Sequence, residues 1–210
     1  MRIAELSRVS GVPVPTIKYY LREGLLPAGE LTSPNQADYG DQHLHRLRLI
    51  RALVDLGQVP VAGVKRIIEA LDSDSLSLHD QIGRAHRALT PTRKQAASEE
   101  ARAAATAQVT DLITRRGWSV DPDAPALSTL IETVAALRTL GQDNLVTFLD
   151  AYAEAVERFT ELEIDAVTTN PTRDQLAESV VIGTILGETL ISSLRLLAQE
   201  SISAHRWKNR

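Results

Sequence analysis

The side chains best suited to chemistry in this chain lie in one short stretch near its N-terminus, from Thr16 to Glu23. In a helix at 100° per residue, Val14, Ile17 and Leu21 fall on one side and a polar set falls on the other. Hydroxyl, ammonium and guanidinium groups on such a face can donate hydrogen bonds to phosphate oxygens and to base edges. The stretch therefore predicts a helix that reads nucleic acid. The polar set consists of Thr16, Tyr19, Tyr20 and Glu23, flanked by Lys18 and Arg22.

Two short helices are expected to position this set. The first contains Ile3, Leu6 and Val9 and ends at Gly11, and the second begins near Pro13 and ends at Gly24. Two helices joined by a tight glycine-containing turn form the helix-turn-helix plan, in which the second helix enters the major groove. The pattern alone leaves an alternative open, because an amphipathic helix with tyrosines also occurs at the edge of an ordinary helical bundle.

The segments that follow predict a hairpin or loop and then two more helices. Residues 25–40 are rich in Pro, Gly, Ser, Asn and Asp, which excludes a long helix there. Apolar spacing then predicts one helix over about 41–56, closed by Gly57, and another from Pro60 to Leu71.

The first 72 residues resemble the DNA-binding domain of MerR-type transcriptional regulators. The resemblance is carried by Ile3-Ala4-Glu5-Leu6-Ser7, Gly11-Val12, Thr16-Ile17-Lys18-Tyr19-Tyr20 and Glu23-Gly24-Leu25-Leu26-Pro27. It continues through residues 47–53, Leu56-Gly57 and residues 67–71.

The resemblance implies a homodimer that binds double-stranded promoter DNA, bends or undertwists it, and has RNA polymerase as a candidate partner. It also implies a winged helix-turn-helix and a long antiparallel coiled coil after the fourth helix. Carried over by position, the recognition-helix contacts are Thr16, Lys18, Tyr19 and Tyr20, with Arg22 beside them, Tyr39 is the wing contact, and Arg48 and Arg51 are candidate backbone contacts.

Three positions depart from the family pattern. Pro15 and Lys18 stand where members usually carry arginine, and Ala37 leaves the wing without its usual arginine. Lysine is a point charge without the bidentate fork of arginine. We therefore expect weaker or narrower DNA recognition than in a typical member. The alternative function is a protein-interaction module whose helix-turn-helix has degenerated.

The rest of the chain predicts an all-α protein apart from the small wing hairpin. We expect a connecting segment over 73–90, a long linker or dimerisation helix over 91–117, and a helical effector-binding or dimerisation domain over 118–210. The long helix would begin at Thr90-Pro91 and end at Gly117. Helices over about 124–140, 143–168 and 172–204 would form the C-terminal bundle.

Aromatic side chains are scarce in this chain, at 4% of residues, and four of them cluster between residues 118 and 159. A pocket that they line could hold a small apolar or aromatic effector. The competing interpretation is that they are core residues. The four are Trp118, Phe148, Tyr152 and Phe159.

The composition and the motifs of the chain exclude several classes of site and of function. The chain has no cysteine, which excludes thiolate metal sites and cysteine nucleophiles. No catalytic motif or metal-binding spacing is evident, so we expect no enzyme activity, no cofactor and no metal. The absence of a signal peptide or a lipidation motif predicts a cytoplasmic protein with no membrane partner.

The net charge of −4 is unevenly distributed along the chain. Residues 1–71 hold 9 Lys and Arg against 7 Asp and Glu, a net of +2, whereas residues 91–210 hold 12 against 17, a net of −5. The first third is therefore the better candidate for meeting DNA.

Overall fold

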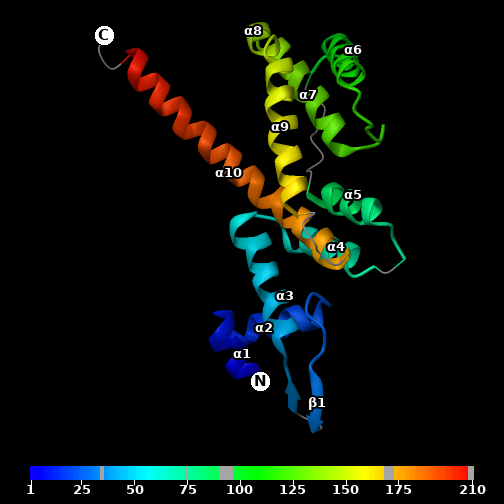
Figure 1. Cartoon of the computed structure of the whole chain (residues 1–210), viewed down its shortest axis with the longest axis vertical. Helices are drawn as coiled ribbons and strands as arrows, with labels where there is room; N and C mark the ends of the chain where they lie inside the picture. The colour runs from blue at the N-terminus through cyan, green and yellow to red at the C-terminus, as the bar shows by residue number, and fades with distance from the viewer. Residues whose placement is uncertain (34–35, 74, 90–96, 168–172, 208–210) are drawn as a thin grey trace. The chain divides into compact units, whose positions relative to one another are not determined.

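The computed structural model describes residues 1–33, 36–73, 75–89, 97–167 and 173–207 of the chain (Figure 1). The chain divides into two compact units. Unit 1 combines residues 1–85 with 172–210, and unit 2 comprises residues 86–171. The described part of both units is mainly helical, as the sequence predicts.

Unit 1 begins with the predicted pair of short helices, α1 (Ile3–Ser10) and α2 (Val14–Arg22). Gly11 ends α1 at a φ of 70°, a left-handed conformation that glycine adopts without steric cost. A proline in the first turn of α2 leaves no hydrogen bond unmade, because the first N–H groups of a helix have no partner within it. The sequence signals for both ends of the turn are therefore confirmed.

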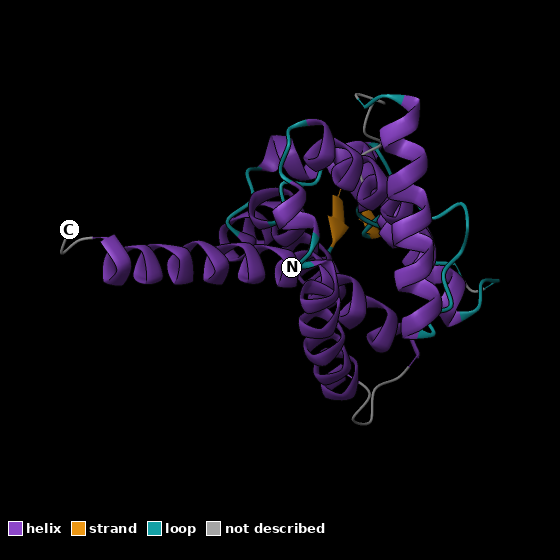
Figure 2. Ribbon diagram, turned by 90° about the horizontal axis from the view of Figure 1, so that it is seen from above, coloured by secondary structure: helices purple, strands orange, loops and turns teal. Residues whose placement is uncertain are grey.

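A two-stranded antiparallel hairpin follows α2 and forms the wing. Strand β1 (Glu30–Ser33) pairs with β2 (Gln36–Asp38), with Glu30 opposite Asp38 and Leu31 opposite Ala37. Figure 2 draws the strands of this hairpin in orange. The chain's first residue holds the base of the wing, since the Met1 ammonium donates to the Tyr39 carbonyl at 2.8 Å and the Tyr39 N–H donates to the Met1 carbonyl at 2.8 Å.

Helix α3 (Asp41–Arg51), its π-helical continuation η1 (Ala52–Leu56) and α4 (Val61–Leu71) complete the N-terminal domain. Aliphatic side chains from these helices and from α1 and α2 form the core. At the start of α3, the buried His43 accepts a hydrogen bond from the Gly40 N–H at Nδ1 (3.0 Å) and lies 3.3 Å from the Ala28 carbonyl through Nε2. This histidine is structural. The core includes Leu6, Ile17, Leu47, Ile50, Leu53, Val64 and Ile67.

The 35-residue helix α10 (Arg173–Trp207) also belongs to unit 1. Its first half packs on η1 and α4 (Figure 1). Ala177, Val181 and Ile185 of this half are buried. The ring nitrogen Nε2 of His45 lies 2.6 Å from Glu178, a further link between α3 and α10. From Leu176 to Trp207 this helix is long and apolar enough to cross a membrane by length and composition alone, which is weak evidence for a single helix.

Residues 73–90, predicted as a connecting segment, contain a helix, α5 (Leu78–Leu89). Ser77 caps its N-terminus, because its hydroxyl oxygen accepts the Asp80 N–H at 3.1 Å and its O–H donates to the Asp80 carboxylate at 2.6 Å. The hydrogen bond from the Ser77 hydroxyl to the Asp80 carboxylate lowers the pKa of Asp80.

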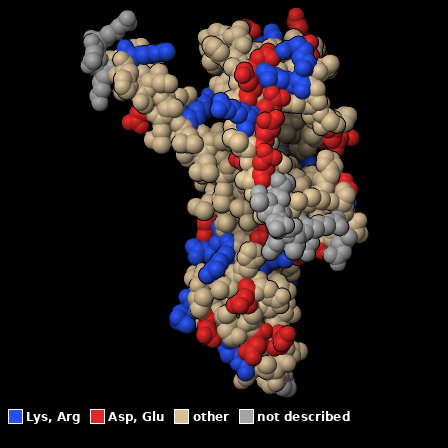
Figure 3. Space-filling model, in the orientation of Figure 1, with Lys and Arg blue, Asp and Glu red and all other residues tan. Residues whose placement is uncertain are grey.

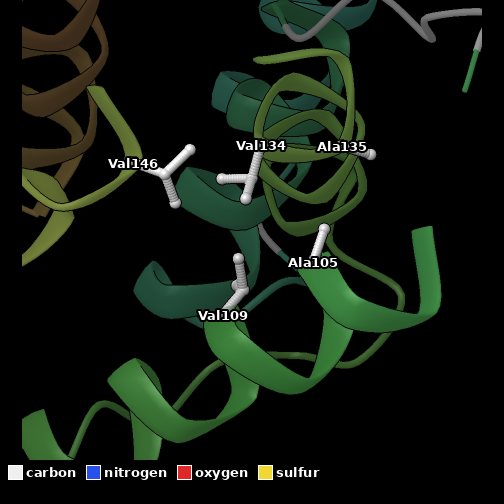
Figure 4. Close-up of a cluster of buried hydrophobic side chains, with 5 residues drawn as sticks. All are labelled: Ala105, Val109, Val134, Ala135 and Val146. Carbon is white, nitrogen blue, oxygen red and sulfur yellow. The ribbon is translucent and has the colours of Figure 1, made fainter. Parts of the chain in front are cut away.

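Unit 2 is built from α6 (Glu99–Arg116), α7 (Pro125–Thr139), α8 (Asp143–Val146) and α9 (Leu149–Val167). Small side chains make its core, so α6 and α7 approach closely. Arg102 of α6 also lies 2.8 Å from the buried carboxylate of Glu132 on α7. Figure 4 shows the core, which consists of Ala105 and Val109 of α6, Val134 and Ala135 of α7, and Val146 of α8.

Helix α6 corresponds to the long helix predicted over 91–117. Its described part begins at Glu99, capped by the Ser98 hydroxyl, and ends at Gly117 with a φ of 67°; residues 91–96 lie outside the described ranges. The apolar face of α6, expected to meet a partner chain, packs on α7 of the same chain.

Candidate nucleic-acid interface

The exposed face of α2 is narrower than the sequence predicts. Pro15, Lys18 and Arg22 are exposed, while Thr16 and Tyr19 are half-buried. The guanidinium carbon of Arg22 lies 5.5 Å from the centroid of the Tyr19 ring, within cation–π distance. The exposed face of α2 therefore carries a guanidinium and an ammonium group, with an aromatic ring beside the guanidinium.

Tyr20 does not belong to this face. It is 8% exposed and, with Ile17 one turn earlier, packs into the domain core. Burial raises the pKa of the Tyr20 phenol, and the nearby Asp55 carboxylate and Tyr19 raise it further. The prediction that Tyr19 and Tyr20 point outward together is therefore wrong for Tyr20, whose phenol stays neutral and inside.

Tyr39, predicted as the wing contact, is also buried, with 8% of its surface exposed. Its ring meets the His43 imidazole edge-on, with 5.2 Å between the centroids. Only a small part of the side chain is left for a backbone contact with DNA.

The two candidate backbone arginines differ from each other. Arg48 is exposed on α3. Arg51 pairs with Asp55 at 3.0 Å and donates to the Ser10 carbonyl at 3.3 Å, so it joins α3 to the end of α1. Arg51 thus has contacts within the domain, although half of its side chain is exposed.

A basic side chain from outside the hairpin also lies at the wing, which the sequence did not predict. Arg2 donates to the Thr32 hydroxyl at 2.6 Å and pairs with Asp38 at 3.4 Å, and half of its side chain is exposed. Its guanidinium therefore lies on the hairpin that lacks an arginine of its own. No local pattern links residue 2 to residues 32 and 38; only the pairing of Met1 with Tyr39 brings them together.

Unit 2 has a groove of about 620 Å³ at Trp118. The Trp118 indole N–H donates to the Glu157 carboxylate, which also accepts a hydrogen bond from Arg116 at 2.9 Å. The tryptophan is therefore held against α9. The groove is lined by Trp118, Val156, Glu157, Thr160, Glu161, Ile164 and Asp165.

The other three aromatics predicted to line a pocket are not part of this groove. Phe148 and Tyr152 are exposed on α9, and Phe159 is half-buried. Helix α9 turns Ala153 and Leu149 inward instead, and Arg115 and Arg116 at the end of α6 bind the acidic side of α9. The Arg115 guanidinium donates to both carboxylate oxygens of Asp150, at 2.8 and 3.2 Å, and lowers the pKa of that carboxyl.

A short basic helix exposed beside an antiparallel hairpin defines a winged helix-turn-helix protein. Residues 1–71 match the model of the MerR HTH family regulatory proteins. The solved structure of the putative transcriptional regulator SCO5550 from Streptomyces coelicolor A3(2) matches 99% of this chain and 98% of its own, with a TM-score of 0.74 and 34% identity. The chain therefore belongs to the MerR family, through its N-terminal domain.

The curated relatives match over a smaller share of the chain. The transcriptional regulator HmrR of Sinorhizobium medicae is 44% identical over 57 residues, which are 27% of this chain and 39% of that protein. The mercuric resistance operon regulatory protein of Bacillus cereus is 33% identical over 79 residues, 38% of this chain and 59% of that protein. The chain thus aligns with about two fifths to three fifths of the length of these relatives.

The names of some relatives refer to metals, among them the heavy metal-dependent transcription regulator 2 of Rhizobium meliloti, 40% identical over 57 residues that make up 27% of this chain and 39% of that protein. Across the residues that the structure describes, no group of three or more His, Asp or Glu side chains is placed to hold a metal ion. Because the chain also has no cysteine, it cannot bind metal through thiolates.

Proposed function

We propose that this protein is a transcriptional regulator that binds promoter DNA as a homodimer, with α2 as the recognition helix and the hairpin as the wing. The observation that carries the proposal is the exposed pair Lys18 and Arg22 on a helix of the MerR-type domain. Arginine and lysine donate to guanine in the major groove and to phosphates. The names of the relatives, all regulators of transcription, support this function.

The contacts follow from the exposed face. Arg22, oriented by the Tyr19 ring, is the better candidate for a base contact, because a guanidinium can bind guanine through two hydrogen bonds. Lys18 on the recognition helix contacts a phosphate as a point charge. Arg2 at the wing contacts a phosphate through its guanidinium group. Tyr20 and Tyr39 position these groups from inside the domain.

Binding of the full chain to its own upstream DNA tests the proposal, measured by fluorescence anisotropy over a salt series. We expect Arg22→Ala to weaken specific binding by about 5- to 150-fold, the equivalent of a base contact of roughly 1–3 kcal/mol. Lys18→Ala should reduce the slope of log K against log salt concentration by about 0.9.

Arg84→Ala is the matched control, since Arg84 is exposed on α5, outside the MerR-type domain. It should leave affinity and salt slope unchanged. Wild-type protein that binds upstream DNA and random DNA equally weakly would contradict the proposal and favour a protein-interaction role for the domain.

We further propose that unit 2 binds a small aromatic effector in the groove at Trp118. The indole and the side chains of Val156 and Ile164 offer apolar surface, and Glu157, Glu161 and Asp165 add negative charge. An aromatic compound with a cationic group fits this lining better than a neutral one, and an anionic compound fits worst.

Three naphthalene compounds of similar size test the effector site: naphthylmethylammonium, naphthol and naphthoate. In a Trp207→Phe variant Trp118 is the sole tryptophan, so its fluorescence reports on the groove. We expect affinity to fall from cation to neutral compound to anion, and Glu161→Gln to weaken the cation selectively. The same weak response to all three compounds would contradict this site.

A further inference from the structure

Helix α9 of unit 2 has an apolar face that is largely exposed to solvent. Phe148, directly before the helix, is 55% exposed and Leu162 is 64% exposed. Ala155, between them in sequence, is also exposed. A helix of a soluble protein normally buries its apolar face, and a large exposed one marks an interaction site. The face is therefore a candidate surface for a partner.

We propose that this face pairs with α9 of another copy of the chain as a parallel two-stranded coiled coil. Its residues recur at alternating spacings of four and three, the pattern of a coiled-coil seam. The contact goes beyond the proposed function, because it joins unit 2 of one dimer to unit 2 of another. The seam consists of Phe148, Tyr152, Ala155, Phe159, Leu162 and Ala166.

The charged residues beside the seam indicate the occupant and the orientation. In a parallel pair, the residue just before one seam position lies beside the partner's residue five positions further along. Arg158 and Glu163, both exposed, stand in this relation. A symmetric parallel pair therefore makes two ion pairs between Arg158 and the partner's Glu163. An antiparallel pair that aligns the whole seam would place Arg158 beside the partner's Arg158, and like charges repel.

The acidic side of α9 does not oppose this pairing. At 100° per residue, Asp150, Glu157 and Glu161 lie roughly opposite the seam. Figure 3 shows acidic side chains along α9 on the face in view. Asp150 and Glu157 also bind Arg115 and Arg116 of the same chain. Repulsion between two acidic helices is therefore weak at the contact itself.

The area of the face predicts a reversible association. At roughly 200 Å² for a fully exposed large side chain, four residues of the face leave about 420 Å² exposed in each chain. A standard interface buries about 800 Å² per partner, and weak or transient contacts bury less. We therefore expect the contact to form as the concentration of the chain rises. The four residues are Phe148, Tyr152, Val156 and Leu162.

The contact is tested by the mass of the full chain in solution, measured by light scattering over a series of concentrations. The mass of the wild type should rise above twice the chain mass of 23.0 kDa as the concentration increases. Leu162→Asp and Ala155→Glu each place a carboxylate in the seam, so their mass should not rise above that value, with helix content unchanged. A wild-type mass that never exceeds twice the chain mass overturns the inference.

Leu140→Asp is the matched control, since Leu140 at the end of α7 is 72% exposed and lies in the same unit outside the seam. It should associate as the wild type does. Association that is lost in the control as readily as in the two seam variants overturns the inference.

Exchange of the two flanking charges tests the orientation. Arg158→Glu and Glu163→Arg should each weaken the association by about 2- to 30-fold, the effect of two exposed ion pairs. The double variant Arg158→Glu/Glu163→Arg makes the same pairs with the charges exchanged and should associate like the wild type. Failure of the double variant to recover overturns the parallel orientation.

A thiol at the end of the seam identifies the occupant. Ala166→Cys reacts specifically, because the chain has no other cysteine. In a parallel pair the two thiols lie side by side, and a short bismaleimide should join them into a product of twice the chain mass. An aligned antiparallel pair separates the thiols by about 27 Å along the axis. Absence of the cross-linked product in a chain that associates overturns the inference and favours another occupant of the face.

Failure of this contact and failure of the proposed function are distinguishable. Leu162→Asp should still bind upstream DNA as a dimer. A wild-type chain that associates through α9 but does not bind promoter DNA would contradict the proposed function alone. A Leu162→Asp variant that is monomeric would contradict the separate dimer of the proposed function and leave the α9 contact in place.

Discussion

Gly57 lies where α10 packs on the end of η1, and its substitution tests how tightly the two are joined. A Cβ built at Gly57 would lie 2.3 Å from Cγ2 of Ile185 on α10 and 2.9 Å from the Leu53 carbonyl oxygen. Both distances are shorter than van der Waals contact. The φ of Gly57, −77°, is one that alanine adopts freely, so Gly57→Ala adds a steric conflict without backbone strain.

The expected cost follows from these contacts. Overpacking of a close-packed site costs about 1–3 kcal/mol. Replacing glycine by alanine also lowers the conformational entropy of the unfolded chain, which offsets about 0.4–1 kcal/mol of this cost. We therefore expect the free energy of unfolding to fall by roughly 1–2 kcal/mol, measured by urea titration with circular dichroism.

A double-mutant cycle identifies the contact responsible. Ile185→Ala removes the methyl group that the new Cβ would meet, so the cost of Gly57→Ala should be smaller in that background, with a coupling of at least about 0.5 kcal/mol. Gly83→Ala is the control, because a Cβ there meets nothing within 4 Å and should stabilise α5 by up to about 1 kcal/mol. Unchanged stability of Gly57→Ala, or strict additivity with Ile185→Ala, would refute the packing described for α10.

Three further predictions concern α5, α6 and the stability of the fold. Ser98→Ala removes the cap that accepts the Ala101 N–H at 3.2 Å and should destabilise α6 by about 1 kcal/mol, whereas an unchanged urea midpoint would speak against the cap. Leu112→Ala should cost about 2–5 kcal/mol in a urea titration, because Leu112 is fully buried; a cost below 1 kcal/mol would mean that this side chain is not packed. Burial lowers the pKa of His86 below 6.5, so the unfolded chain binds more protons and the free energy of unfolding should fall as the pH drops below about 6.5. His86→Leu should flatten that dependence between pH 7.5 and 5.5, and equal slopes in variant and wild type would contradict the assignment.

Local signals in the sequence were enough to place most helix ends of the N-terminal domain. Gly11 and the prolines before Thr16 define the turn between α1 and α2 because their backbone preferences act within a few residues. The N-cap of α5 has a local signal of the same kind, because Ser77 stands three residues before Asp80. The acidic and serine-rich composition around Ser77 nevertheless led to the prediction of a connecting segment.

Side-chain orientation depended on partners that are distant in sequence. Tyr20 and Ile17 are one turn apart, and a helical wheel alone cannot decide whether the core of the domain extends to the tyrosine. The aromatic side chains Phe148, Tyr152 and Phe159 of this part of the chain were expected to line a pocket or to belong to the core. In the structure Phe148 and Tyr152 are exposed, and the acidic side of α9 pairs with Arg115 and Arg116 of α6.

For the long helices, too, the sequence does not show which partner each one packs on. The repeat at three and four residues predicts a helix but not its partner, since α6 packs on α7 of its own chain while the end of α10 packs on nothing described in unit 1. Arg2 reached the wing through the pairing of Met1 with Tyr39, a contact between residues 38 positions apart.

The central claim, that a dimer reads DNA through α2, is tested most directly by footprinting the full chain on its own upstream DNA. We predict two protected segments on one face of the duplex, one helical turn apart, which Arg22→Ala weakens at both. A single protected segment, or protection that Arg22→Ala leaves intact, would contradict it.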